Sequence, residues 1–344
     1  MVEKPRSKLG WAFYVKLVLT FGVLGFLATL VKWPDLIREI QHSDPRWLAI
    51  GTLLSGCSVL IVTLRWWLLM KVQEIRLTFR HTLALTFIGQ FFSAFLMGAN
   101  GGDVMRVFYA MRAVPNQKAK STMTILVDRL FGTLMVLAWI FAVLPYEVSR
   151  ISGDPAMAHK LVLFKVILLV MAIGAVVLFF APFHLFPPWS KRLWGKIPKR
   201  EMIAELHADS RLYLRRWPLT LSALLCAATI HLINFTAFYF LAKGFGLQMT
   251  FSAAVLILSF TMMAAAAPLS IGGHGIREVT FISLFTLFQI EPFSKEICIA
   301  LSLTFYLLYQ FSWSAVGGMV YLFYHHQVKK VEGEAEVPPR HTTA

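Results

Sequence analysis

Long apolar segments constrain this chain more than any other feature of its sequence. A helix needs about 20 mostly apolar residues to cross the hydrocarbon core of a bilayer. Hydrophobic residues make up 57% of the chain and charged residues only 15%, against roughly 45–50% and about 25% in soluble domains. These values exclude a water-soluble enzyme and predict an all-α polytopic membrane protein. The apolar segments are Trp11–Val31, Trp47–Met70, Thr82–Ala99, Thr122–Leu144, Leu161–Ala181, Pro218–Ala242, Phe251–Ile271, Ile276–Ile290 and Ile297–Tyr324.

The charge and the cysteines narrow the functional class further. The formal net charge is +15, from 33 Lys and Arg against 18 Asp and Glu. A nucleic-acid-binding domain can be this basic, but it does not carry apolar runs of membrane-spanning length, so no nucleic-acid partner is expected. Cys57, Cys226 and Cys298 form no C-x-x-C pair, which predicts neither a metal site nor a disulfide framework. Walker A, H-E-x-x-H and G-x-S-x-G motifs are also absent from the sequence, so we expect a protein that is not an enzyme and carries no cofactor.

The distribution of lysine and arginine predicts the topology, because positive charge collects in cytoplasmic loops. The connection 182–217 is the richest in basic residues, and Lys4, Arg6 and Lys8 precede the first apolar segment. Both termini are therefore predicted to be cytoplasmic. Residues 182–217 also mix tryptophans and leucines with these charges, which is typical of an amphipathic segment on an anionic membrane surface. A solvated basic loop is the other interpretation.

Two segments fit this charge pattern only if they return to the side from which they enter. Thr82–Ala99 is short, and basic residues flank it on both sides, so Thr82–Asp103 is predicted to enter from the cytoplasm and return to it. By the same argument Thr250–Ile290 enters from the outer face and returns to that face. The expected architecture is about six full transmembrane helices plus two re-entrant helical hairpins. Eight transmembrane helices without hairpins are the alternative.

The tips of the two predicted hairpins share a sequence pattern. Gly101-Gly102 and Gly272-Gly273 both begin Gly-Gly-x-x-x-Arg, nearly half the chain apart. This spacing predicts half-repeats of about 10–160 and 161–325 with inverted topology, a plan that recurs in secondary transporters. Glycine pairs that only let helices pack closely are the second interpretation. The polar tail 326–344 is expected to be disordered and cytoplasmic.

Ionisable residues inside membrane segments are costly and are therefore candidates for function. A Gly-Gly turn that starts a helix exposes backbone N–H groups that hold an anion. Arg106 and Arg277 follow one turn later, and each offers a planar donor fork that suits phosphate. In the other interpretation, the glycines only permit the reversal and the arginines extend to the interface. The candidate substrate-binding residues are Asn100, Gly101, Gly102, Asp103, Arg106, Asp128, Arg129, Gly272, Gly273, Arg277 and Glu278.

Asp128 and Arg129 lie about six residues inside their apolar segment. Neighbours on a helix point about 100° apart, so we expect Asp128 to face one of the arginines and Arg129 to face Asp103 or Glu278. An ion pair that holds helices together and a head-group site are both compatible with this expectation.

Other polar residues in the apolar segments are expected to have packing or interfacial roles. Arg65 precedes two tryptophans, which predicts an interfacial anchor, with a phosphate contact as the second interpretation. His231 and Asn234 lie one helical turn apart and are expected to form hydrogen bonds between helices.

Three runs together resemble a known family. They are Asn100-Gly101-Gly102-Asp103-Val104-Met105-Arg106, then Asp128-Arg129, then Pro268-Leu269-Ser270-Ile271-Gly272-Gly273-His274-Gly275-Ile276-Arg277-Glu278. In order and rough spacing they are similar to the lysylphosphatidylglycerol synthase transmembrane region, also called the flippase-like domain family. The resemblance covers about Leu9 to Tyr324.

The resemblance implies an integral inner-membrane protein of bacteria or archaea that handles lipids. The best-known members carry an added cytoplasmic domain that transfers an amino acid from tRNA to phosphatidylglycerol. Only about twenty residues follow Tyr324, too few for such a domain, so residues 1–325 are expected to act as a stand-alone flippase-like domain. The leading hypothesis is a flippase for phosphate-bearing, anionic membrane lipids. The alternative is a non-transporting scaffold that presents lipid to a separately encoded lipid- or glycan-modifying enzyme.

Overall fold

The computed structural model describes residues 33–95, 101–151, 155–180, 210–266, 275–308 and 312–335. Within these ranges the chain is helical and contains no strand, apart from one isolated bridge between Gln248 and Glu291. The predicted all-α fold of a multi-pass membrane protein is confirmed. The predicted first span, Trp11–Val31, lies outside the described residues, as do Asn100, Gly272, Gly273 and most of the basic segment 182–217.

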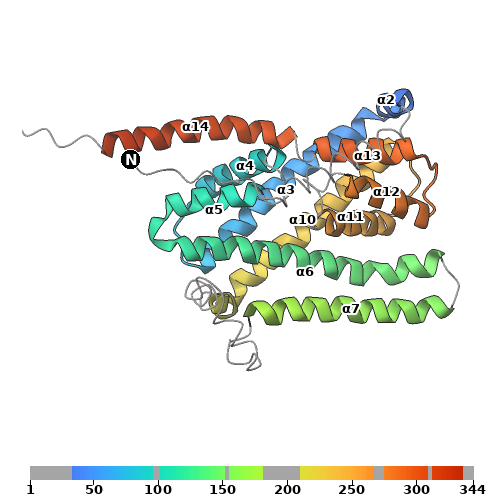
Figure 1. The fold of residues 1–344 in the computed structure, drawn as a ribbon, viewed down its shortest axis with the longest axis horizontal. Helices are drawn as coiled ribbons and strands as arrows, with labels where there is room; N and C mark the ends of the chain where they lie inside the picture. The colour runs from blue at the N-terminus through green and yellow to red at the C-terminus, as the bar shows by residue number, and fades with distance from the viewer. Residues whose placement is uncertain are drawn as a thin grey trace, which may run out of the picture.

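Four of the described helices are long and apolar enough to cross a membrane: α3 (Pro45–Val72), α6 (Lys118–Ile151), α7 (Pro155–Phe180) and α10 (Trp217–Gly244). α3 begins with Pro45, and Pro218 is the second residue of α10; proline suits a first turn, whose N–H groups have no partner inside the helix. These two helices pack closely, because a β-carbon at Gly51 would lie only 3.0 Å from Cγ of Leu241. Figure 1 shows them crossing the middle of the molecule.

α7 lies beside α6 at the edge of the bundle (Figure 1). Its apolar side chains are largely exposed: Val162, Leu163 and Val170 each expose more than 60% of their surface. An apolar face of this extent marks a contact with another apolar phase. In a membrane protein, that phase is the lipid tails.

Two pairs of shorter helices occupy opposite halves of the molecule (Figure 1). The first pair is α4 (Phe79–Phe95) with α5 (Gly101–Ala113), and the second is α11 (Phe251–Ala266) with α12 (Ile276–Leu287). Helices of 12 to 17 residues reach about 18–25 Å, which is less than the roughly 30 Å of the hydrocarbon core. The second pair lies within the predicted segment Thr250–Ile290. The first pair continues to Ala113, ten residues beyond Asp103, where the predicted hairpin ended. Re-entry into the membrane stays a prediction for both pairs.

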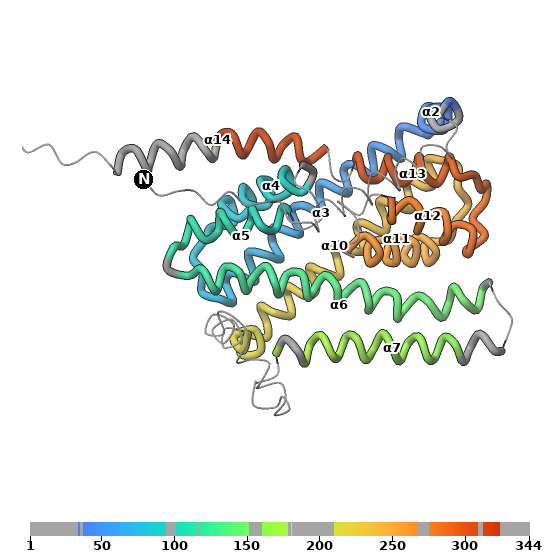
Figure 2. Tube along the Cα trace, in the orientation of Figure 1, coloured from blue at the N-terminus to red at the C-terminus, as the bar shows by residue number. Residues whose placement is uncertain are grey.

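The last predicted apolar segment, Ile297–Tyr324, contains two helices, α13 (Lys295–Tyr306) and α14 (Ser312–Ala335). Residues 309–311, between these helices, lie outside the described residues. α14 lies against α4, and a β-carbon at Gly317 would meet the Phe87 carbonyl oxygen at 2.1 Å. Figure 2 traces these two helices in the last part of the colour range.

Two further differences concern the chain between and after the spans. α2 (Trp33–His42) is a helix in a connection for which no helix was predicted, and it packs on α13. α14 extends to Ala335, so the backbone is helical in part of the tail that was expected to be disordered. Residues 336–344 lie outside the described residues.

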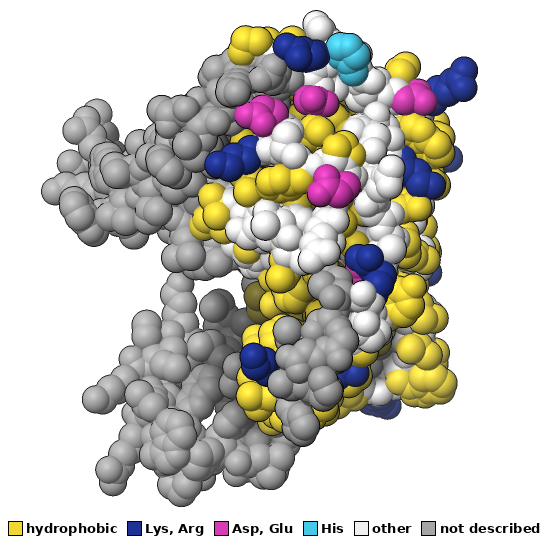
Figure 3. Space-filling model, turned by 90° about the vertical axis from the view of Figure 1, so that its right-hand side faces the viewer, with side chains coloured by type: hydrophobic (Ala, Val, Ile, Leu, Met, Phe, Trp, Pro, Cys, Tyr) yellow, Lys and Arg dark blue, Asp and Glu magenta, His cyan; other side chains and the backbone are white. Residues whose placement is uncertain are grey.

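The two ends of the molecule differ in charge. Figure 3 looks at the end where α3 begins, and acidic and basic side chains both appear there. The described segments near the start of α3 are α2, which packs on α13, and the residues that join these helices to their neighbours. Their charged residues are Arg38, Glu39, Asp44, Arg46, Glu291, Lys295 and Glu296. The end where α3 finishes carries mainly basic side chains in the described residues: Lys71, Arg76, Arg80, Arg112, Lys118, Lys120, Arg215 and Arg216, with Glu74 among them. We call this the basic end.

Candidate functional site

A buried group of charged side chains joins α3, α5 and α6. Asp128 of α6 is at its centre: its Oδ1 lies 2.6 Å from Nε of Arg65, and its Oδ2 lies 3.4 Å from Nη1 of Arg106. The side chains of Arg65, Arg106 and Asp128 are only 10%, 8% and 3% exposed. One carboxylate therefore bridges two arginines from two other helices.

Asp103 and the half-exposed Arg129 extend this buried group. We call the five residues the Arg106 cluster: Arg65, Asp103, Arg106, Asp128 and Arg129. Arg106 Nη1 donates to Asp103 Oδ1 at 3.3 Å, and Arg129 donates to the other oxygen of Asp103. Asp128 thus faces arginines and Arg129 faces Asp103, as the sequence predicts. Three arginines against two aspartates leave the cluster with an excess of positive charge.

Arg65 does not have the interfacial position that its neighbours suggested. It is buried, and the next residue, Trp66, is fully buried and donates from its indole N–H to Thr124 Oγ1 at 3.0 Å. Trp67 instead donates to the Leu77 carbonyl at 3.0 Å and lies under the Lys71 ammonium group. Adjacent helical residues point about 100° apart. Trp66 and Trp67 therefore face different surroundings, and Arg65 faces the interior of the bundle.

Arg106 has unused hydrogen-bonding capacity. Its Nη1 serves both aspartates, whereas its Nε and Nη2 atoms are buried without a hydrogen-bond partner among the described residues. The guanidinium carbon lies 4.1 Å from the centroid of the Trp66 ring, which fixes the plane of the group. Nε and Nη2 form one edge of the guanidinium, the fork that binds two oxygens of a carboxylate or phosphate. Most buried donors in proteins have partners, so this edge points to a ligand.

The glycines near Arg106 let two helices approach closely. A β-carbon at Gly102 would lie 1.9 Å from Ser93 Oγ and 2.3 Å from the Gly89 carbonyl oxygen. A β-carbon at Gly89 would lie 2.5 Å from Cγ of Arg106. This geometry gives Gly102 a packing role, and the predicted anion contact of Gly101 and Gly102 stays a prediction.

The second arginine lies in a different environment, which we call the Arg277 cluster: Gly275, Arg277, Glu278, Ser302 and Tyr306. Nε and Nη2 of Arg277 lie 3.0 and 2.6 Å from the same oxygen of Glu278, and Nε also donates to Ser302 Oγ at 3.1 Å. The other Glu278 oxygen accepts from the backbone N–H of Gly275 at 2.7 Å. Gly275 has φ +83°, a conformation that favours glycine. The donor fork of Arg277 is therefore occupied by the neighbouring carboxylate.

Comparison with known proteins places the chain in a family. The family model for the lysylphosphatidylglycerol synthase TM region matches residues 13–317. The chain belongs to this family. It is also similar to a UPF0104 membrane protein of Pyrococcus horikoshii, with 24% identity over 295 residues, covering 80% of this chain and 88% of the relative. A UPF0104 membrane protein of Methanothermobacter thermautotrophicus is 27% identical over 113 residues, which is 33% of this chain and 31% of that protein.

In this lysylphosphatidylglycerol synthase TM region protein, His231 connects the Arg106 cluster to α10. Its Nε2 lies 3.1 Å from the Gly132 carbonyl oxygen of α6, rather than bonding within its own helix. A β-carbon at Gly132 would lie 3.8 Å from Arg65 Nη1, an ordinary contact distance, so this part of α6 passes close to Arg65. The expectation that His231 bonds between helices is confirmed.

Glu147 is a buried carboxylate that the sequence analysis missed. It is fully buried, and it accepts hydrogen bonds from Ser252 at 2.5 Å, from Thr250 at 3.2 Å and from Arg150 at 2.5 Å. It lies three residues beyond the predicted apolar segment Thr122–Leu144. α6 in fact continues through Pro145, and Glu147 ties it to the start of α11. In the described part of the chain, no group of three His, Cys, Asp or Glu is arranged to hold a metal ion.

Proposed function

We propose that this protein translocates a phosphate-bearing lipid across the membrane and that the Arg106 cluster holds the head-group phosphate. The observation that carries this proposal is the buried Nε–Nη2 edge of Arg106, which has no partner among the described residues. An unsatisfied buried donor costs about 1–3 kcal/mol, and more when it is charged. A phosphate that accepts from both nitrogens removes this cost.

The charge of the cluster favours an anionic head group. Two aspartates do not balance Arg65, Arg106 and Arg129; the first two arginines are buried among the helices, and Arg129 is 53% exposed. A free anion would have to lose its water to enter, whereas a lipid carries its phosphate on apolar tails that the helices accommodate. Membership of a family named for the membrane region of a lipid synthase supports a lipid as the cargo.

The proposed topology places the basic end in the cytoplasm and the protein in the cell inner membrane. Positive charge marks cytoplasmic segments, and the described charges differ between the two ends in that sense. We take α4 with α5, and α11 with α12, as re-entrant pairs entering from opposite sides, since these helices are shorter than the hydrocarbon core. Both termini are then cytoplasmic.

The test is translocation of fluorescent phosphatidylglycerol by the purified chain in reconstituted vesicles, measured by dithionite quenching. Arg106→Lys keeps the positive charge beside Asp103 and Asp128 but removes the donor fork. We expect translocation to fall at least tenfold, while Arg46→Lys, a matched change at the opposite end of α3, leaves it unchanged. Size-exclusion profiles verify that both variants fold.

Two results would contradict the proposal. If Arg106→Lys translocates lipid at the wild-type rate, the fork does not hold the head group. If the wild-type chain translocates no lipid and instead purifies with a lipid-modifying enzyme, the scaffold hypothesis is the correct one.

A further inference from the structure

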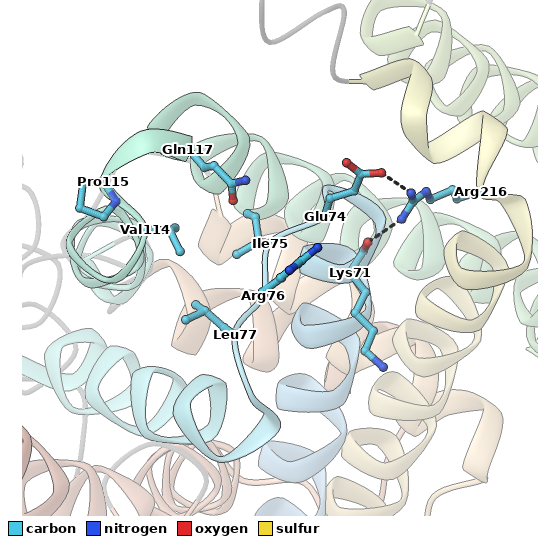
Figure 4. A pocket seen from close by; sticks show the side chains of 9 residues that line it. All are labelled: Lys71, Glu74, Ile75, Arg76, Leu77, Val114, Pro115, Gln117 and Arg216. Carbon is cyan, nitrogen blue, oxygen red and sulfur yellow. Dashed lines mark hydrogen bonds and ion pairs between the residues drawn. The ribbon is translucent and has the colours of Figure 1, made fainter.

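A pocket of about 870 Å³ opens at the basic end of the molecule. It lies between the α3–α4 connection, the α5–α6 connection and the residue that precedes α10 (Figure 4). Its lining residues are Lys71, Glu74, Ile75, Arg76, Leu77, Val114, Pro115, Gln117 and Arg216. It is separate from the Arg106 cluster and shares no residue with it.

The lining divides into an apolar side and a charged side. Figure 4 shows Ile75, Leu77 and Val114 on one side, Glu74 and Arg216 on the other, and Arg76 between them. Such a lining matches an amphiphilic ligand, one with a charged group attached to an apolar body.

The charges that remain uncompensated in this pocket are positive. Arg216 is already engaged, because it donates to the Lys71 carbonyl at 3.1 Å and pairs with Glu74. The Lys71 ammonium lies 3.6 Å from the centroid of the Trp67 ring and has no carboxylate partner in the described residues. Arg76 makes no hydrogen bond or ion pair with any residue that the structure describes. Arg76 is therefore available to an anionic group. Lys71 adds a second positive charge, although its side chain extends away from Arg76 in Figure 4.

The pocket and the Arg106 cluster are built on the same helices at different depths. On α3, Lys71 lies six residues after Arg65, which corresponds to about 9 Å along the helix. On the other side, Val114 follows Arg106 by eight residues, or about 12 Å. A head group in the pocket would therefore lie roughly 10 Å from the fork of Arg106, at the end that we place in the cytoplasm.

We propose that this pocket binds the phosphate group of an amphiphilic ligand before that group reaches Arg106. Lys71 and Arg76 contact the phosphate, and Ile75, Leu77 and Val114 contact the apolar part. The inference rests on the proposed function for its place in the transport path, but the binding itself does not. The phosphate has two sources, a lipid head group or soluble phosphate, and the apolar side favours the lipid.

The experiment measures binding of water-soluble dihexanoyl phosphatidylglycerol to the purified full chain in detergent, by isothermal titration calorimetry. The double variant Lys71→Gln/Arg76→Gln is compared with Arg46→Gln/Arg80→Gln, which removes two exposed charges outside the pocket. We expect the pocket variant to bind at least tenfold more weakly and the control variant to stay within twofold of wild type. Repeating the titration in an Arg106→Lys background isolates the pocket from the deeper site.

Equal affinity of the pocket variant and wild type would overturn the proposal. A parallel titration with inorganic phosphate distinguishes a lipid head group from soluble phosphate. Weak or absent phosphate binding supports a lipid ligand, and phosphate affinity equal to that of the lipid overturns the lipid assignment. The two proposals can fail separately. If the chain binds lipid at the pocket but translocates none, only the proposed transport function is refuted.

Discussion

Arg106 and Arg277 have the same local sequence pattern but different chemistry. Each follows a glycine pair by the same spacing, each is buried, and each guanidinium lies on an aromatic ring, at 4.1 Å from Trp66 and 4.4 Å from Tyr306. The Nε–Nη2 edge of Arg277 is closed by Glu278, whereas the same edge of Arg106 is open. A repeated motif thus places one arginine in a structural role and leaves the other available to a ligand.

One neighbouring residue accounts for much of this difference. Arg277 is followed by Glu278, whose carboxylate reaches back to the guanidinium, and Arg106 is followed by the apolar Val107. The carboxylates near Arg106 come instead from Asp103, one turn earlier, and from Asp128 on another helix. Both of these bind Nη1, so the fork stays open.

The largest effect is expected for Arg277→Ala. It leaves Glu278 buried without its charge partner, and breaking a buried ion pair in this way costs about 3–5 kcal/mol. We predict a large decrease in the melting temperature in detergent, measured by intrinsic fluorescence. The double variant Arg277→Met/Glu278→Gln removes both charges and should recover most of the stability. A melting temperature unchanged in Arg277→Ala would mean that the Arg277 cluster is not structural.

Val107→Glu should place a carboxylate on the Nε–Nη2 edge of Arg106, as Glu278 does for Arg277. The new carboxylate occupies the position that Glu278 has relative to Arg277 and competes with a phosphate for the fork. We predict at least a tenfold loss of lipid translocation in vesicles, with the chain still folded. Val107→Gln has the same shape without the charge and is the matched control. Normal translocation by Val107→Glu would show that the fork of Arg106 is not the binding edge.

A smaller effect is expected for Gly89→Ala, which tests how the packing of α4 positions Arg106. Its β-carbon would lie 2.5 Å from Cγ of Arg106, so the side chain or the helix must shift, at a cost of about 1–3 kcal/mol. We predict a severalfold loss of translocation with a modest loss of stability. Gly174→Ala is the control, because nothing lies within 4 Å of its added carbon. Equal translocation by the two variants would show that the packing of α4 does not position Arg106.

Several parts of this structure could be predicted from the sequence. The long apolar runs predicted α3, α6, α7 and α10, because burying polar backbone in lipid requires a continuous helix. The rarity of charges in those runs identified Asp128 and Arg129 and predicted that each would find a partner of opposite charge. Both did, since an unpaired charge in an apolar environment is too costly to persist.

Other features depended on helix orientation, which composition does not encode. Arg65 looked like an anchor beside two tryptophans, yet the rotation of α3 turns it toward Asp128. The close contact of α5 with α4 requires glycine at position 102, a packing role that the local sequence pattern does not reveal. The pocket at the basic end is formed by three connections that are distant in the sequence, so no local pattern predicts it.

The sequence by itself determined that this chain is a helical membrane protein with a few charged residues that must be paired. It also contained, in Arg106-Val107 and Arg277-Glu278, the residue difference between the two arginines. Only the tertiary structure decided which atoms are paired and which are left over. The physical reason is that lipid requires charges to find partners, while the packing of the helices determines which partners lie within hydrogen-bonding distance.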